Sequence, residues 1–166
     1  IDSWGILALY SNGLALEDIG LNKVQSIVTT DYEAYIFGAR AMGLDVSDYS
    51  RKLVECQTDS GKFADSISGK GEDLVNAHIF GIIAMHCAGE PIPNRDKCLE
   101  WLENQQHKDG GFTWDVKYFD DPADYDLVDS DVDMTAAGLM GLAILGEDES
   151  NPHVARALQF LHDEQL

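Results

Sequence analysis

Basic residues are scarce in this sequence. Eleven lysines and arginines stand against 30 aspartates and glutamates, which gives a formal net charge of −19. Nucleic acids and anionic membrane surfaces attract proteins through basic patches, so this balance argues against both as partners. Long apolar runs are also missing, since no segment approaches the roughly 20 apolar residues that span a bilayer. We therefore expect neither a nucleic-acid partner nor membrane insertion.

Cysteines are few and scattered, and no alternating β-strand pattern is visible. Cys56, Cys87 and Cys98 form no C-x-x-C pair, and with the five histidines they lack the tight grouping of a zinc site. We expect three buried free thiols and no metal cofactor. What the chain does contain is 45% hydrophobic residues in 166 positions, enough for one domain with a real core. The expected class is all-α.

A motif recurs along the chain with the form L-x3-Q-x3-G-x-F. It is complete in 53-LVECQTDSGKF-63 and 102-LENQQHKDGGF-112, and 161-LHDEQL-166 contains its first half. Glycine permits positive φ, and a glutamine side chain can bond the backbone at the start of a following helix. The motif is therefore predicted to tie each helical hairpin to the next. Its structural residues are Gln57, Gly61, Phe63, Gln106, Gly110, Gly111 and Phe112.

The remainder of each unit repeats as well. Apolar, small-residue-rich segments end at Gly43, Gly89 and Gly146, where glycine is the usual left-handed helix stop, and a more amphipathic segment follows each. This pattern predicts hairpins of an inner and an outer helix in two concentric layers. The segment 4-WGILALYSNG-13 is predicted as a further inner helix, with 21-LNKVQSIV-28 as its helical partner. The units of the single domain 1–166 are roughly 1–28, 29–63, 74–112 and 131–166.

The segments 57-QTDSGKF-63 and 106-QHKDGGF-112 resemble the signature of the prenyltransferase and squalene-oxidase repeat family. This resemblance spans essentially the whole chain and implies the α/α toroid of terpenoid cyclases and protein prenyltransferase β-subunits. A complete toroid in that family needs about twice this length, so we expect an incomplete arc from a longer chain. The segments 30-TDYEAYIFGA-39 and 131-DVDMTA-136 are similar to toroid-like domains of Gram-positive surface and secreted proteins. That similarity implies an extracellular or cell-surface location.

The segment 131-DVDMTA-136 also resembles the D-x-D-D-T-A motif of class II terpene cyclases. The resemblance would make Asp133 the acid that protonates an alkene, with Asp131 in support. However, Met134 replaces the last aspartate of the motif. Asp133 also stands at the same distance before the closing glycine as Thr30 and Asn76 do in their units, and all three are good N-cap residues. We therefore expect Asp133 to cap a helix, and catalysis is the alternative.

The connection 113-TWDVKYFDDPADYDLVDS-130 interleaves aromatic and acidic residues. Long ordered loops often carry function, and aromatic side chains beside carboxylates suit a sugar, a cationic ligand or Ca²⁺. A solvated acidic loop is the alternative, and no EF-hand spacing is present. The predicted binding residues are Trp114, Tyr118, Phe119, Tyr125 and Asp129.

Together, these features favour a non-catalytic repeat domain of a bacterial secreted or surface protein. We expect it to bind a small molecule, a protein or a carbohydrate in a cavity or on a concave face. The alternative is a class II terpene cyclase-like enzyme that uses Asp133.

Overall fold

The computed structural model describes residues 1–116 and 130–165. Regular structure in these residues is helical, and strand pairing among them is limited to isolated bridges. The all-α prediction is confirmed. The helices are α1 (Ser3–Ser11), α2 (Thr29–Ala41), α3 (Ser47–Cys56), α4 (Val75–Ala88), α5 (Arg95–Asn104), α6 (Val132–Ile144) and α7 (Pro152–Asp163).

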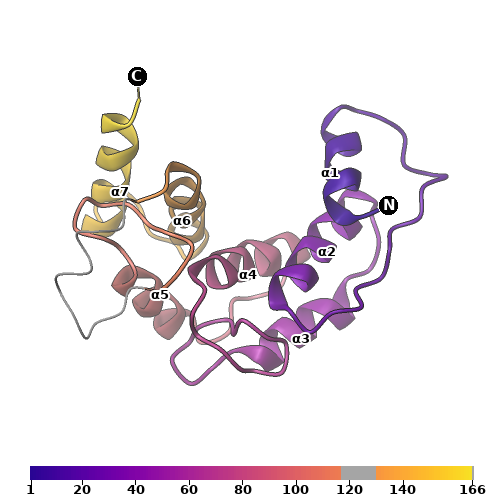
Figure 1. The fold of residues 1–166 in the computed structure, drawn as a ribbon, viewed down its shortest axis with the longest axis horizontal. Coiled ribbons are helices and arrows are strands. Elements are labelled where there is room, and N and C mark those ends of the chain that lie inside the picture. Colours follow the sequence, from indigo (N-terminus) through magenta and orange to yellow (C-terminus); the bar gives the residue numbers. More distant parts are fainter. Residues whose placement is uncertain (117–129, 166) are drawn as a thin grey trace.

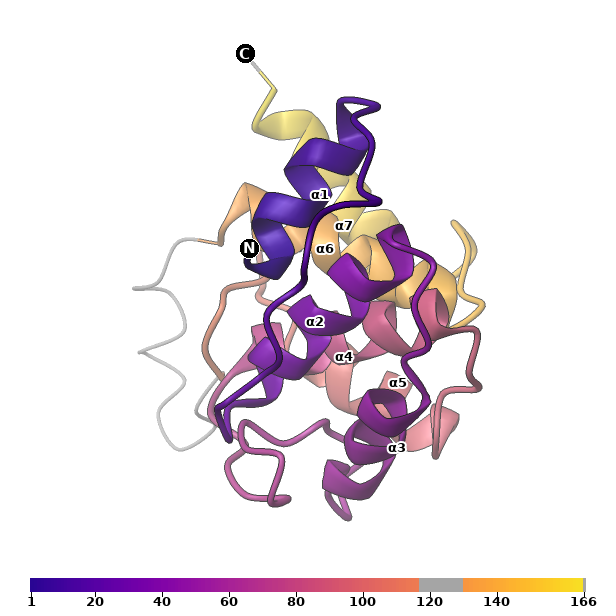
Figure 2. The ribbon, with the colours of Figure 1, turned by 90° about the vertical axis from the view of Figure 1, so that its right-hand side faces the viewer.

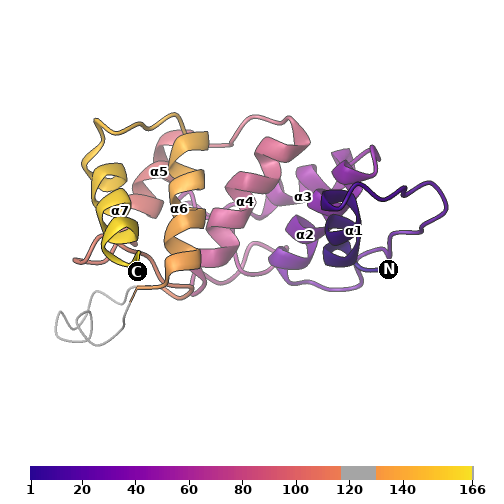
Figure 3. The same cartoon turned by 90° about the horizontal axis from the view of Figure 1, so that it is seen from above.

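The helices form an arc with two layers (Figure 1). Helices α1, α2, α4 and α6 follow one another along the inner layer, where each packs against the next (Figure 3). Helices α3, α5 and α7 lie outside and pack on α2, α4 and α6 respectively. Figure 2 shows the arc from the end at which α1 packs against α2. The predicted order of inner and outer helices is therefore confirmed.

The phenylalanine of each repeated motif packs on a glycine in the next inner helix. A Cβ added to Gly81 in α4 would lie 2.5 Å from the Phe63 ring, and one added to Gly138 in α6 would lie 2.9 Å from the Phe112 ring. Both phenylalanines are fully buried. The small residues of the inner helices therefore leave room for the rings that join neighbouring units, and the core runs continuously along the arc.

The prediction that Thr30, Asn76 and Asp133 cap the inner helices is wrong. All three residues lie inside the first turn, because the helices begin one residue earlier. At the start of α6 the capping side chain is that of Asp131, which accepts a hydrogen bond from the Met134 amide (2.7 Å). Helices α2 and α4 have no side-chain cap. Their first amides instead donate to backbone carbonyls of the connection that follows the next outer helix.

The segment 21-LNKVQSIV-28 is not helical, so the predicted partner of α1 is absent. The chain runs extended here, and the Ile27 carbonyl accepts a hydrogen bond from the Ile67 amide (2.8 Å). Val28 pairs with Ser66 in an isolated bridge. The β-branched residues of this segment suit an extended chain, and pairing with the 64–71 connection satisfies their backbone groups better than a short isolated helix would.

Candidate functional site

The two complete motifs make the same hydrogen bonds in both units. The Gln57 side-chain amide donates to the carbonyl of Gly61 (2.9 Å) within its own turn and to that of Pro93 (2.8 Å) ahead of α5. The Gln106 side chain repeats this with Gly110 (2.8 Å) and with His153 (2.8 Å) at the start of α7. Each glutamine therefore joins one outer helix to the next, as the sequence predicts.

The motif glycines have no room for a side chain. Gly61 and Gly110 have φ values of 92° and 94°, which favour glycine. A Cβ on Gly61 would lie 2.6 Å from the backbone of Lys97 in α5, and one on Gly110 would lie 2.5 Å from the backbone of Arg156 in α7. Gly111 is similarly tight against Ser130. These residues are parts of the scaffold, which agrees with their predicted structural role.

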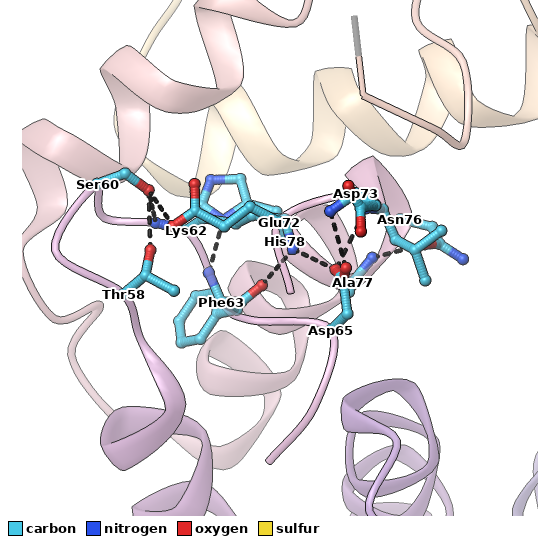
Figure 4. A network of polar contacts seen from close by, with 11 residues as sticks. Thr58, Ser60, Lys62, Phe63, Asp65, Glu72, Asp73, Asn76, Ala77 and His78 are labelled. Atoms are coloured by element: carbon cyan, nitrogen blue, oxygen red, sulfur yellow. Dashed lines mark hydrogen bonds and ion pairs between the residues drawn. The ribbon is translucent and has the colours of Figure 1, made fainter. Parts of the chain in front are cut away.

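A buried polar network begins at Lys62 and Phe63, the last two residues of the first motif (Figure 4). The Lys62 side chain is fully buried, and its ammonium donates to the Phe63 carbonyl (2.8 Å) and to Asp65 Oδ1 (2.6 Å). The Phe63 amide donates to Nδ1 of His78 (3.1 Å), and Nε2 of His78 then donates to the Cys98 carbonyl (2.9 Å). Burial lowers the pKa of His78 to about 3, so its imidazole is neutral. This network positions the start of α4.

Glu33 on α2 is buried, and it lacks the partners that a buried carboxyl normally has. Its side chain is 1% exposed, and neither carboxyl oxygen has a hydrogen-bond partner among residues 1–116 and 130–165. Burial raises the pKa of Glu33 well above its usual range, and the nearby Lys62 ammonium only partly opposes this. An unsatisfied buried polar group costs stability, so this position calls for a functional explanation.

The concave side holds an apolar cavity of about 480 Å³. Helices α1, α2, α4 and α6 all contribute to its walls, which consist mainly of aliphatic and aromatic side chains. Trp4 is 60% exposed there and Met140 is 54% exposed. Helices α1 and α6 therefore leave apolar side chains uncovered at this face. Cys87 also lies exposed in this cavity, which corrects its predicted burial, whereas Cys56 and Cys98 are buried.

A second cavity of about 240 Å³ adjoins the first turns of α2 and α4. Its polar lining is Thr30, Asp31, Glu33 and Asn76. Trp4, Phe37 and Phe80 line this cavity and the apolar one alike. None of the sequence motifs predicts this site. The one signal for it in the sequence is Glu33, an acid on the apolar side of an otherwise core-forming helix.

None of the predicted site residues that the structure describes lines either cavity. Asp131 and Asp133 are both exposed at the start of α6, and Trp114 is exposed after the second motif. Tyr118, Phe119, Tyr125 and Asp129 lie outside the described residues. The alternative of a calcium site in the acidic loop falls largely in the same segment. Among the described residues, no group of three or more His, Cys, Asp or Glu side chains could hold a metal ion.

Residues 74–166, more than half of the chain, match the family model of the squalene-hopene cyclase C-terminal domain. The chain belongs to that family. Its fold is therefore of the α/α toroid type, built here as an arc of inner and outer helices. Searches of curated proteins and of solved structures found no match.

Membership of the squalene-hopene cyclase family confirms the resemblance drawn from the repeated motif. The likeness to Gram-positive surface proteins stays a prediction. In residues 1–116 and 130–165, every helix is too short to cross a membrane.

Proposed function

We propose that this protein is a non-catalytic binding domain that holds an elongated apolar molecule against its concave face. The single observation that carries this proposal is the apolar cavity of about 480 Å³, to which all four inner helices contribute. Its volume lies in the range of ligand sites, and such sites are mostly apolar. The squalene-hopene cyclase family is named for a linear isoprenoid substrate, which makes an isoprenoid chain the first ligand to test.

The exposure of Trp4 and Met140 supports a ligand at this face. Large apolar side chains that gather at one concave surface are typical of an interaction site. Burying them against a hydrocarbon chain would contribute roughly 25 cal/mol for each Å² removed from water. Folding does not require an apolar ligand at this face, because the Phe63 and Phe112 contacts already fill the core between the units.

The surroundings of the aspartates at α6 support a non-catalytic role. An acid that protonates an alkene must be held neutral in a dry cavity. Asp133 is exposed to water in the first turn of α6, so it does not lie in a dry cavity. Asp131 is occupied in capping the helix. Neither residue lines the apolar cavity.

The proposal is tested by binding of farnesol, a linear isoprenoid alcohol, measured by displacement of the neutral fluorophore N-phenyl-1-naphthylamine. We expect saturable displacement and a roughly tenfold weaker farnesol affinity in Met140→Glu, because the new charge would be desolvated by the ligand. The matched control is Leu158→Glu, which adds the same charge at a similarly exposed apolar position on the outer helix α7. Equal affinities in the two variants, or no displacement at all, would contradict the proposal.

Family membership supports a second candidate, a class II cyclase-like enzyme with Asp133 as the acid and Asp131 in support. The test is conversion of squalene or farnesol by the wild-type protein and by Asp133→Asn. An activity that is lost in Asp133→Asn while farnesol affinity is retained would establish this candidate. If neither protein forms a cyclic product, the cyclase candidate is excluded.

We also propose an extracellular or cell-surface location, which the similarity of 30-TDYEAYIFGA-39 and 131-DVDMTA-136 to surface-protein domains supports. Fractionation of the source cells with an antibody against this domain tests it. Recovery in the cytosol alone would exclude this location.

A further inference from the structure

Three aromatic side chains separate the two cavities of the concave face. Trp4 of α1 and Phe37 of α2 have ring centroids 6.5 Å apart, and Phe37 and Phe80 of α4 are also 6.5 Å apart. The rings are tilted by 53° and 69°, so they do not stack on one another. All three line both cavities. A single ligand that extends along these three rings would contact both cavities.

The two cavities on either side of these rings differ in chemistry. On one side is the apolar cavity already described. On the other side is the 240 Å³ cavity, whose lining residues include Asp31 and Glu33. Asp31 is exposed, whereas Glu33 is 1% exposed and its two oxygens have no hydrogen-bond partner in the described part of the chain.

The nearby Lys62 ammonium does not donate a hydrogen bond to Glu33. Lys62 is the charged group that acts on Glu33, but its ammonium is committed to the Phe63 carbonyl and the Asp65 carboxylate. A buried carboxyl without a donor is costly, and a ligand that brings positive charge would remove that cost. Aromatic ring faces also attract cations, and most strongly where water is excluded.

We propose that the ligand is an amphiphile with an organic ammonium head. The head lies between Glu33, Asp31 and the rings of Trp4, Phe37 and Phe80, and the hydrocarbon chain extends past these rings into the apolar cavity. This inference rests on the proposed function, since it assigns a head group to the same apolar ligand. The net charge of −19 adds a long-range attraction for a cation and opposes an anionic head.

The test compares three probes with the same eight-carbon chain, each below its micelle concentration, by isothermal titration calorimetry. The probes are octyltrimethylammonium, neutral 1-octanol and anionic octanoate. We expect octyltrimethylammonium to bind about tenfold more tightly than 1-octanol, in line with a partly desolvated cation–aromatic contact. Octanoate should bind more weakly than 1-octanol. If 1-octanol equals octyltrimethylammonium, the ammonium inference is overturned and the apolar site stands. If none of the three binds, both proposals fail.

Variants locate the head group. Asp31→Asn and Glu33→Gln should each weaken octyltrimethylammonium binding at least about threefold and leave 1-octanol binding unchanged. The control is Asp96→Asn, which removes an exposed carboxylate from the first turn of the outer helix α5 and should not change the affinity of either probe. Thermal unfolding followed by circular dichroism shows which variants are folded. Should both Asp31→Asn and Glu33→Gln bind the cation as wild type does, the assignment is overturned.

Discussion

At the residue scale, the two aspartates before α6 separate into different roles. Asp131 has extended backbone angles and holds the Met134 amide, whereas Asp133 lies one step inside the helix. A cap is defined by the residue at which the chain turns from extended to helical, and counting back from a closing glycine does not locate that residue.

The roles of Asp131 and Asp133 can be measured as free energies of unfolding in urea. We expect Asp131→Ala to cost about 1 kcal/mol, because it removes a side-chain cap. Asp133→Ala should change stability by less than about 0.5 kcal/mol, since its side chain is exposed. A larger loss in Asp133→Ala than in Asp131→Ala would restore the cap assignment that the sequence suggests.

Glu33 predicts a pH dependence of stability. Burial raises its folded-state pKa above the unfolded value, so its contribution to stability is fully present below the unfolded pKa and is lost as pH rises toward the folded pKa. Glu33→Gln has no proton to lose at this position. We therefore expect the stability of Glu33→Gln relative to wild type to increase as pH rises above about 4.5.

The Glu33 prediction is measured by urea unfolding from pH 4 upward. Lys62 and Cys56 also interact with Glu33, but burial lowers the Lys62 pKa from 10.5 and raises the Cys56 pKa to about 11. Cys56 therefore stays neutral below neutral pH, and Lys62 is present in both wild type and Glu33→Gln. A constant difference between wild type and Glu33→Gln across this range would show that Glu33 ionises normally.

At the element scale, the inner helices are supported unequally. Helix α4 packs against α2 and α6 in its own layer and against α3 and α5 outside, whereas α1 packs mainly against α2 among the described helices. We expect amide hydrogen exchange to be slowest in α4 and fastest in α1, because opening free energies follow the number of buried contacts. Equal protection of α1 and α4, measured by mass spectrometry, would contradict this order.

Some of the helices can be predicted from local sequence patterns alone. The apolar segments that end at Gly43, Gly89 and Gly146 predict α2, α4 and α6, because the helix period and the left-handed stop are local properties. The local pattern of segment 21–28, in contrast, does not predict its structure. Its apolar residues allow a helix, but hydrogen bonds to the distant 64–71 connection hold it extended.

At the scale of the whole molecule, the net charge of −19 opposes compaction. Carboxylates greatly outnumber cations, and several of the ion pairs in the described residues are exposed and therefore weak. We expect the melting temperature to rise as sodium chloride increases from low concentration to about 0.15 M, where the Debye length is about 8 Å. An equal osmolality of sucrose serves as the control. A fall in melting temperature with salt would show that attractive pairs dominate instead.

The repeat, the class of fold and the joints between units follow from the amino-acid sequence alone. These depend on short-range rules: helix period, glycine at positive φ, and the spacing of Gln57 and Gln106 to backbone acceptors. The position of the proposed site depends instead on tertiary packing. Curvature of the arc brings Trp4, Phe37 and Phe80 together from three helices, and Glu33 beside them has no hydrogen-bond partner in the described part of the chain. Such convergence depends on how helices pack across the chain, which local pattern does not encode.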